Sequence, residues 1–140
     1  MKIKLKNKKR IILHQVNCQG VMGAGFAKQI KNKYPLCFTE YKKICKTKKS
    51  EELLGTIYIY EGDKDIIINM FSQDKYGRDK RYTDYIAMEK AKKKLRKIYP
   101  SEIIIAPYKI GCGLAGGNWD IVKEILERYN ITVSKNIIFI

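Results

Sequence analysis

The chain has 140 residues, a formal net charge of +15 at pH 7 and hydrophobic residues at 45% of its positions. A chain of this length forms one domain with its own core, here residues 1–140. It lacks an apolar run of about 18 residues, the length that spans a membrane, and it lacks the apolar core of a secretory signal. These features predict a soluble, cytoplasmic protein without a membrane partner, and a monomer is the simplest state.

Neither the cysteines nor the basic residues identify a ligand. Cys18, Cys37, Cys45 and Cys112 lie far apart, without the paired spacing of a zinc site or a disulfide framework. We therefore expect reduced cysteines, no metal and no cofactor. Only five of the 29 basic residues are arginine, and the lysines are spread along the chain. The charge predicts a non-specific attraction to nucleic acid rather than a dedicated nucleic-acid site.

Hydrophobic patterning predicts strands and helices in alternation. The strands are predicted at 1–5, 10–17, 55–60, 64–71, 102–107 and 132–140. The helices are predicted at 23–34, 36–46, 84–99 and 119–129. Turn residues predict an antiparallel hairpin between the third and fourth strands. This order predicts an α/β fold, a three-layer α/β/α sandwich with a mixed six-stranded sheet.

Local signals predict where the helices end and which side faces the core. Pro35 and Pro100 are expected to end the helices before them, and Asn118 to cap the helix at 119–129. Residues 46–52 are expected to form a charged link and residues 72–83 a polar loop. The helix at 84–99 is amphipathic. Its predicted inward face consists of Ile86, Met88, Ala91, Leu95 and Ile98.

Two glycine-rich turns each connect a predicted buried strand to a helix. They contain Gly20, Gly23 and Gly25 in the first turn, and Gly111, Gly113, Gly116 and Gly117 in the second. The first turn matches neither the Walker pattern nor the GxGxxG fingerprint. Free N–H groups at a helix start favour an anion, and ligands of open α/β sheets bind where such loops gather. Two such turns side by side suit a ligand with a pyrophosphate, or one with a phosphate at each end.

The residues of these turns resemble those of the macrodomain family. The resemblance rests on NCQGVMGAGFA at 17–27 with Tyr34-Pro35, and on IGCGLAGGNW at 110–119. Within the family, the chain is most similar to the branch that removes phosphate from ADP-ribose 1″-phosphate. It is also similar to the branch that removes ADP-ribose from acidic side chains. The resemblance implies the macrodomain fold and a cleft that binds ADP-ribose or ADP-ribose 1″-phosphate.

The resemblance also implies which residues contact the ligand. They are Asn7, Gln15, Val16, Asn17, Met22, Gly23, Ala24, Gly25, Phe26, Ala27, Ile110, Gly111, Cys112, Gly113, Leu114, Ala115 and Gly116. The first turn would wrap the distal ribose and one phosphate, and the second would hold the pyrophosphate. Asn17 stands where the family's asparagine binds the distal ribose hydroxyls. Lys6-Asn7 replaces the Gly-Asp pair that is usual on the adenine side.

Two residues, His14 and Asn17, are candidate catalytic groups. In the phosphatase branch a histidine occupies the place of His14, and histidine titrates near neutral pH. The alternative for His14 is a packing role in the core, because strand alternation puts it and Asn17 on opposite faces. Ala115 replaces the aspartate that the ester-cleaving branch carries after Gly-Cys-Gly-Leu.

Other side chains near the turns have two interpretations each. Lys80 and Arg81 either close over the ligand or are solvated charges of the loop at 72–83. Phe26 either packs against the distal ribose or anchors its helix. Cys18 and Cys112 are expected to be small packing residues rather than nucleophiles.

The leading hypothesis is a hydrolase that converts ADP-ribose 1″-phosphate to ADP-ribose and phosphate. One alternative is the removal of ADP-ribose from modified protein or nucleic acid. Another is a non-catalytic reader of ADP-ribose, and a last one is a purely electrostatic binder of nucleic acid.

Overall fold

The structure, a computed structural model, describes residues 9–140. Its sheet has the strand order β2-β3-β1-β4-β5. The strands are β1 Arg10–Val16, β2 Ile57–Glu61, β3 Asp65–Phe71, β4 Ile104–Pro107 and β5 Thr132–Ser134. β1 pairs in parallel with β3 and β4, and β4 with β5, whereas β2 and β3 form an antiparallel hairpin. The predicted mixed sheet and hairpin are confirmed.

The sheet differs from the prediction at the two ends of the chain. The strand predicted at 1–5 lies outside the described residues, so the structure shows five strands where six were predicted. The strand predicted at 132–140 is shorter, because β5 ends at Ser134 and residues 136–140 pair with none of the strands described between residues 9 and 140.

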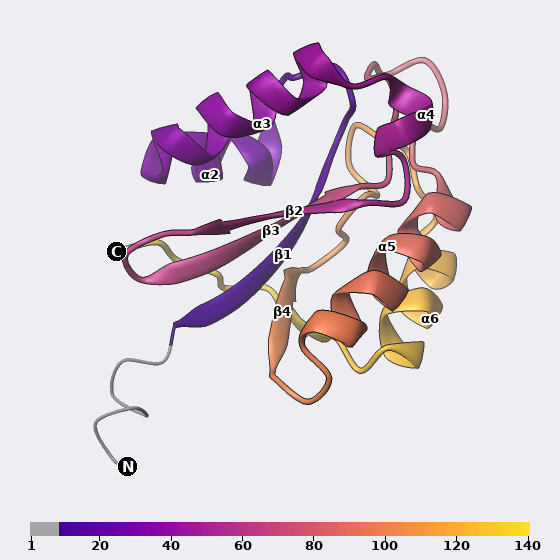
Figure 1. Cartoon of the computed structure of the whole chain (residues 1–140). Helices are drawn as coiled ribbons and strands as arrows, with labels where there is room; N and C mark the ends of the chain where they lie inside the picture. The colour runs from indigo at the N-terminus through magenta and orange to yellow at the C-terminus, as the bar shows by residue number, and fades with distance from the viewer. Residues whose placement is uncertain (1–8) are drawn as a thin grey trace.

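Helices cover both faces of the sheet (Figure 1). They are α2 Gly25–Lys33, α3 Pro35–Thr47, α4 Ser50–Leu53, α5 Tyr85–Ile98 and α6 Trp119–Arg128. α2 and α3 lie on one face, and α5 and α6 on the other. The three-layer arrangement is therefore confirmed. The predicted link at 46–52 instead contains the end of α3 and most of α4. Between residues 9 and 140 there is no helix with the length and apolarity needed to cross a membrane.

Two of the predicted helix signals act at helix starts. Pro35 follows the end of α2, as predicted, and it is also the first residue of α3. Proline fits this position because the first N–H of a helix has no intrahelical acceptor. Asn118 caps α6 as predicted, because its side-chain oxygen accepts from the backbone N–H groups of Asp120 (2.8 Å) and Ile121 (3.4 Å).

Alternate residues of β1 face two separate cores. Ile11 and Leu13 pack on the side of α5 and α6. Ile12 and Val16 pack on the side of α2 and α3. Because side chains alternate along a strand, residues just before the first turn are divided between these two faces.

The buried side of α5 is only partly the predicted one. Its buried residues are Ala87, Met88, Ala91, Lys92 and Leu95. Ile86 and Ile98 are 71% and 52% exposed, so their predicted inward position is wrong. The inward stripe runs at i, i+3, i+4 and i+7 from Met88. Lys92 lies in this stripe, whereas Ile86 and Ile98 lie outside it. The predicted inward face did not include Lys92.

Candidate functional site

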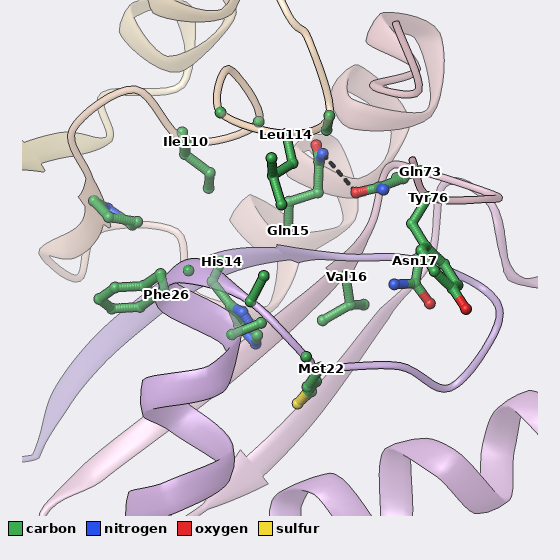
Figure 2. Close-up of a pocket in the computed structure, with 18 of the residues that line it drawn as sticks. His14, Gln15, Val16, Asn17, Met22, Phe26, Gln73, Tyr76, Ile110 and Leu114 are labelled. Carbon is green, nitrogen blue, oxygen red and sulfur yellow. Dashed lines mark hydrogen bonds between the residues drawn. The ribbon is translucent and has the colours of Figure 1, made fainter. Parts of the chain in front are cut away.

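A cavity of about 710 Å³ lies where the two glycine-rich turns meet, beyond the carboxyl ends of β1 and β4. The turns meet because β1 and β4 are parallel neighbours, whose carboxyl ends lie at the same edge of the sheet. The end of β1, both turns and part of the loop at 72–83 supply the walls, as Figure 2 shows. This size suits a nucleotide-sized ligand.

Most of the predicted site residues line this cavity. They are His14, Gln15, Val16, Asn17, Met22, Gly23, Ala24, Gly25, Phe26, Ala27, Ile110, Gly111, Gly113, Leu114 and Ala115. Asn7 lies outside the described residues. Cys112 and Gly116 do not line the cavity. The thiol of Cys112 donates to the carbonyl of Ile110 (3.4 Å), and a Cβ on Gly116 would lie 3.2 Å from the carbonyl oxygen of Lys80. Both residues therefore face protein rather than the cavity.

Sequence reasoning missed part of the wall. The additional lining residues are Val21, Gln73, Tyr76, Gly77, Arg78, Pro107, Tyr108 and Lys109. For most of them, the signal available was position alone, since they flank the turns or belong to the loop that follows β3. In the structure, Lys109 has a φ of 59°. This value is rare for a residue with a side chain and occurs more often at functional sites.

The loop at 72–83 is tied to both turns. The carbonyl of Asp74 accepts from the N–H of Cys18 (2.9 Å), and the carbonyl of Ala115 accepts from that of Tyr82 (2.7 Å). Lys80 and Arg81 do not line the cavity. Their cations lie over the rings of Tyr82 and Tyr85, at 5.2 Å and 4.4 Å from the centroids. These contacts match the interpretation of both as loop charges, and Arg78 is the loop cation at the cavity.

The two turns present backbone N–H groups that nothing in residues 9–140 accepts. No side chain caps the start of α2, and the N–H groups of 25–27 precede the first intrahelical bond, from Lys28 to Ala24. In the second turn, the N–H groups of Gly113, Leu114 and Ala115 are likewise without an acceptor in that range. Such donors, together with the positive end of a helix dipole, bind anionic oxygens.

The charges of the cavity wall have one sign. Arg78 and Lys109 line it, and none of its described lining residues is an aspartate or a glutamate. Two cations and several free N–H groups therefore face the same space. The site favours a ligand that carries several negative charges.

The side chain of Gln15 joins three segments at the cavity floor. Its Nε2 donates to Gln73 Oε1 (3.1 Å) and to Thr83 Oγ1 (2.9 Å), and its Oε1 accepts from Ser72 (2.7 Å). Thr83 in turn donates to the carbonyl of Gly111 (2.6 Å). Both amide hydrogens of Gln15 are thus used by protein, so the residue holds the second turn and the loop at 72–83 in place.

His14 is 1% exposed and faces the side of α2 and α3. Asn69 donates its Nδ2 to the carbonyl of Tyr58 (3.1 Å), which leaves its Oδ1 to accept from His14 Nε2 (2.7 Å). Burial lowers the pKa of His14 to about 4, so the ring is neutral at pH 7. Nε2 therefore carries the proton, and Nδ1 has no partner within residues 9–140. Nδ1 is itself buried, so the ring has no free proton to give and no exposed nitrogen atom.

Asn17 follows the last residue of β1, where the chain turns toward α3. Its Oδ1 accepts from the N–H of Gln19 (2.9 Å) and from the hydroxyl of Tyr41 (2.8 Å), and its Nδ2 donates to the carbonyl of Val21 (2.8 Å). One hydrogen on Nδ2 remains for a ligand. Because the chain turns there, His14 and Asn17 both line the cavity, with Val16 between them (Figure 2).

The thiols near the site are poor nucleophiles. Burial raises the pKa of Cys18 to about 12, and it also raises the pKa of Cys112. Both stay protonated at neutral pH, which agrees with their predicted packing role. Cys18 and Cys112 are free thiols. In the part of the chain that the structure describes, no three His, Cys, Asp or Glu side chains gather in a way that could hold a metal ion.

Comparison with known proteins gives a match over most of the chain. The family model of the Macro domain matches residues 13–126. The DNA ADP-ribosyl glycohydrolase of Mycobacterium tuberculosis is 31% identical over 122 residues, which cover 82% of this chain and 33% of the relative. The chain thus spans about a third of the length of that protein.

A second relative matches over nearly its whole length. The ADP-ribose 1″-phosphate phosphatase of Debaryomyces hansenii is 25% identical over 148 residues, covering 86% of this chain and 83% of the relative. Among solved structures, the macrodomain of Mycobacterium tuberculosis DarG is similar with a TM-score of 0.70 and 23% identity. The match covers 89% of this chain and 86% of that one. This likeness shows a common fold.

Proposed function

The chain belongs to the Macro domain family, and we propose that its cavity binds ADP-ribose and hydrolyses ADP-ribose 1″-phosphate to ADP-ribose and phosphate. The observation that carries the proposal is the cavity between the two turns: within residues 9–140, their N–H groups lack acceptors and the cavity lining contains no carboxylate. The names of the two relatives support an ADP-ribosyl hydrolase, and the near full-length match to the phosphatase favours that reaction.

The cavity matches the parts of ADP-ribose in order. The pyrophosphate is the central, charged part, and the two turns with their free donors form the central walls. Asn17, with one amide hydrogen left, is suited to a hydroxyl of the distal ribose at one end. A 1″-phosphate adds up to two negative charges beside this ribose, and Arg78 and Lys109 are the cations of the wall that can offset them.

The proposed reaction moves a phosphoryl group to water. Water attacks the phosphorus and gives up one proton, the bond from phosphorus to the ribose oxygen O1″ breaks, and that oxygen takes up the proton that the water released. Backbone donors and Arg78 stabilise the charge on the phosphate oxygens, and the turns orient the substrate. His14 is neutral, its only proton is held by Asn69 and its Nδ1 is buried, so its part is structural. It does not protonate the leaving oxygen.

The direct test is phosphate release from ADP-ribose 1″-phosphate by the purified protein. Asn17→Asp keeps the oxygen that accepts from Gln19 and Tyr41 but removes the amide donor, so we expect turnover to fall about tenfold or more while the fold persists. Asn32→Ala, an exposed asparagine on α2, is the matched control and should keep full turnover. Absence of phosphate release by the wild type, at enzyme concentrations equal to substrate, refutes the phosphatase proposal.

A second candidate is a hydrolase that removes ADP-ribose from DNA. The 31% identity to the mycobacterial glycohydrolase favours it. Release of ADP-ribose from a modified oligonucleotide, without phosphate release from the small substrate, would establish this activity instead. Tight ADP-ribose binding in calorimetry without either turnover would identify a reader.

A further inference from the structure

Aromatic rings pack together at the end of the cavity that lies away from Asn17. Phe26 lines the cavity, and Figure 2 shows it and Asn17 at opposite ends. The ring of Phe139 packs against Phe26, with centroids 5.7 Å apart and planes tilted by 45°. His14 packs against the same ring at 6.2 Å. Phe26 is therefore supported from inside the protein and presents what remains of its surface to the cavity.

Phe139 belongs to the C-terminal segment, residues 135–140, which follows the last residue of the Macro domain match. Its ring contacts Tyr34 edge-on at 6.2 Å, and the guanidinium of Arg10 lies 6.0 Å from its centroid. Arg10 also donates to the carbonyl of Ile138 (3.0 Å). These contacts from Arg10 of β1 and from Tyr34, which follows α2, hold the segment against the sheet, so Phe139 has a defined position behind Phe26.

The direction of the bound ligand follows from the two ends of the cavity. If Asn17 holds the distal ribose and the turns hold the pyrophosphate, the nucleoside lies at the end where Phe26 is found. Ile110 of the second turn lies across the cavity from Phe26 (Figure 2). The described lining contains no carboxylate that could accept from the amino group of adenine. Among residues 9–140, this end therefore offers aromatic and apolar surface to a base, and no carboxylate for its edge.

We propose that Phe26 stacks on the base of the bound nucleotide, that Phe139 acts as a positioning residue behind it, and that this subsite tolerates different bases. The proposal rests on the proposed function, since it assumes that the cavity holds a nucleoside diphosphate ribose. Stacking on an aromatic ring accepts any base because every base has a π-face. A site that hydrogen-bonds the base edge would instead discriminate strongly between bases.

Calorimetric titration of the full chain with ADP-ribose and with its hypoxanthine counterpart, IDP-ribose, tests the base subsite. Stacking is worth about a 5- to 150-fold change in affinity, so Phe26→Ala should weaken ADP-ribose binding by at least about fivefold. IDP-ribose should bind the wild type within about threefold of ADP-ribose, because the stack ignores the base edge. Phe38→Ala is the matched control, since Phe38 is a half-buried phenylalanine away from the cavity, and it should keep the wild-type affinity.

The role of Phe139 is tested by a double-mutant cycle. Phe139→Ala should weaken ADP-ribose binding less than Phe26→Ala does, and Phe139→Leu should restore part of the loss by packing behind the ring. If Phe139 acts through Phe26, the double variant binds no more weakly than Phe26→Ala alone. Additive losses would overturn the positioning role, because they would mean an independent effect of the segment.

Other outcomes overturn the base subsite. An unchanged affinity in Phe26→Ala would rule out stacking of the base on Phe26. An affinity for IDP-ribose more than about 30-fold weaker than for ADP-ribose would show that the protein recognises the base edge. In both cases wild-type binding of ADP-ribose leaves the proposed function standing. Failure of the wild type to bind either nucleotide would overturn the proposed function and this inference together.

Discussion

Replacement of Lys92 by methionine should stabilise the protein, and by an amount that depends on pH. Lys92 is fully buried in α5, and its ammonium nitrogen has no hydrogen-bond partner within residues 9–140. Burial lowers its pKa from 10.5 to about 7, and the attraction of Glu89 opposes this only in part. Methionine has a similar length and fills the same space without a charge, so the core contacts persist.

The size of the effect follows from the two pKa values. The folded pKa lies below the unfolded one, so the unfolded chain binds more protons between about pH 7 and 10.5 and stability rises with pH there. The penalty for burying the charge is greatest below the folded pKa, at about 5 kcal/mol. It falls to about 4 kcal/mol at pH 7 and about 2 kcal/mol at pH 9. The free energy of unfolding of Lys92→Met should exceed that of the wild type by these amounts.

Urea unfolding of both proteins at pH 6, 7, 8 and 9 measures the difference. Tyrosines and cysteines that titrate at high pH contribute equally to the stability of both proteins, so the difference between the two proteins is free of their contribution. Lys94→Met, on the exposed side of the same helix, is the matched control and should change stability by less than about 0.5 kcal/mol. A Lys92→Met protein that is no more stable than the wild type at pH 7 would refute the reasoning. So would an advantage that stays constant from pH 6 to 9.

Three further substitutions test the supports of the site. A Cβ on Gly117 would lie 2.5 Å from the carbonyl oxygen of Gly111, so Gly117→Ala should cost about 1–3 kcal/mol in thermal unfolding, whereas Gly113→Ala, with nothing within 4 Å, should be nearly neutral. Gln15→Glu cannot donate to Gln73 and Thr83, so hydrogen exchange in the second turn should accelerate, and unchanged exchange would remove its supporting role. Tyr34→Phe removes the hydroxyl that donates to the buried Asp65 at 2.5 Å, and should cost about 1–2 kcal/mol in urea unfolding, with Tyr60→Phe as the comparison.

Much of the fold was predicted because its signals are local. The hairpin follows from turn residues between two apolar runs, and the cap of α6 follows from Asn118 at the start of an amphipathic stretch. The cavity position follows from two glycine-rich turns after neighbouring strands. The hairpin, the cap and each single turn are made by residues close together in sequence, and backbone geometry and hydrogen bonding suffice to explain them. The two turns meet because β1 and β4 are neighbours in the sheet.

The misses arise where packing overrides the character of a residue. Ile86 and Ile98 were expected inside because they are apolar, yet the stripe of α5 that faces the sheet is fixed by Met88 and Leu95 and carries Lys92 with it. A lysine in that position cannot be foreseen from a hydrophobic pattern. The protein tolerates the cost of desolvating Lys92 only because the many other contacts of α5 fix the orientation of this helix.

The sequence by itself therefore determined the order of the elements, the two turns and the chemistry of their backbone donors. Only the tertiary structure decided how distant residues act on them. It pairs His14 with Asn69 and so fixes its proton, commits the amide of Gln15 to Gln73 and Thr83, and brings Phe139 behind Phe26. These partners are more than 50 residues apart, and their meeting depends on strand order and burial, which leave no mark in the local pattern.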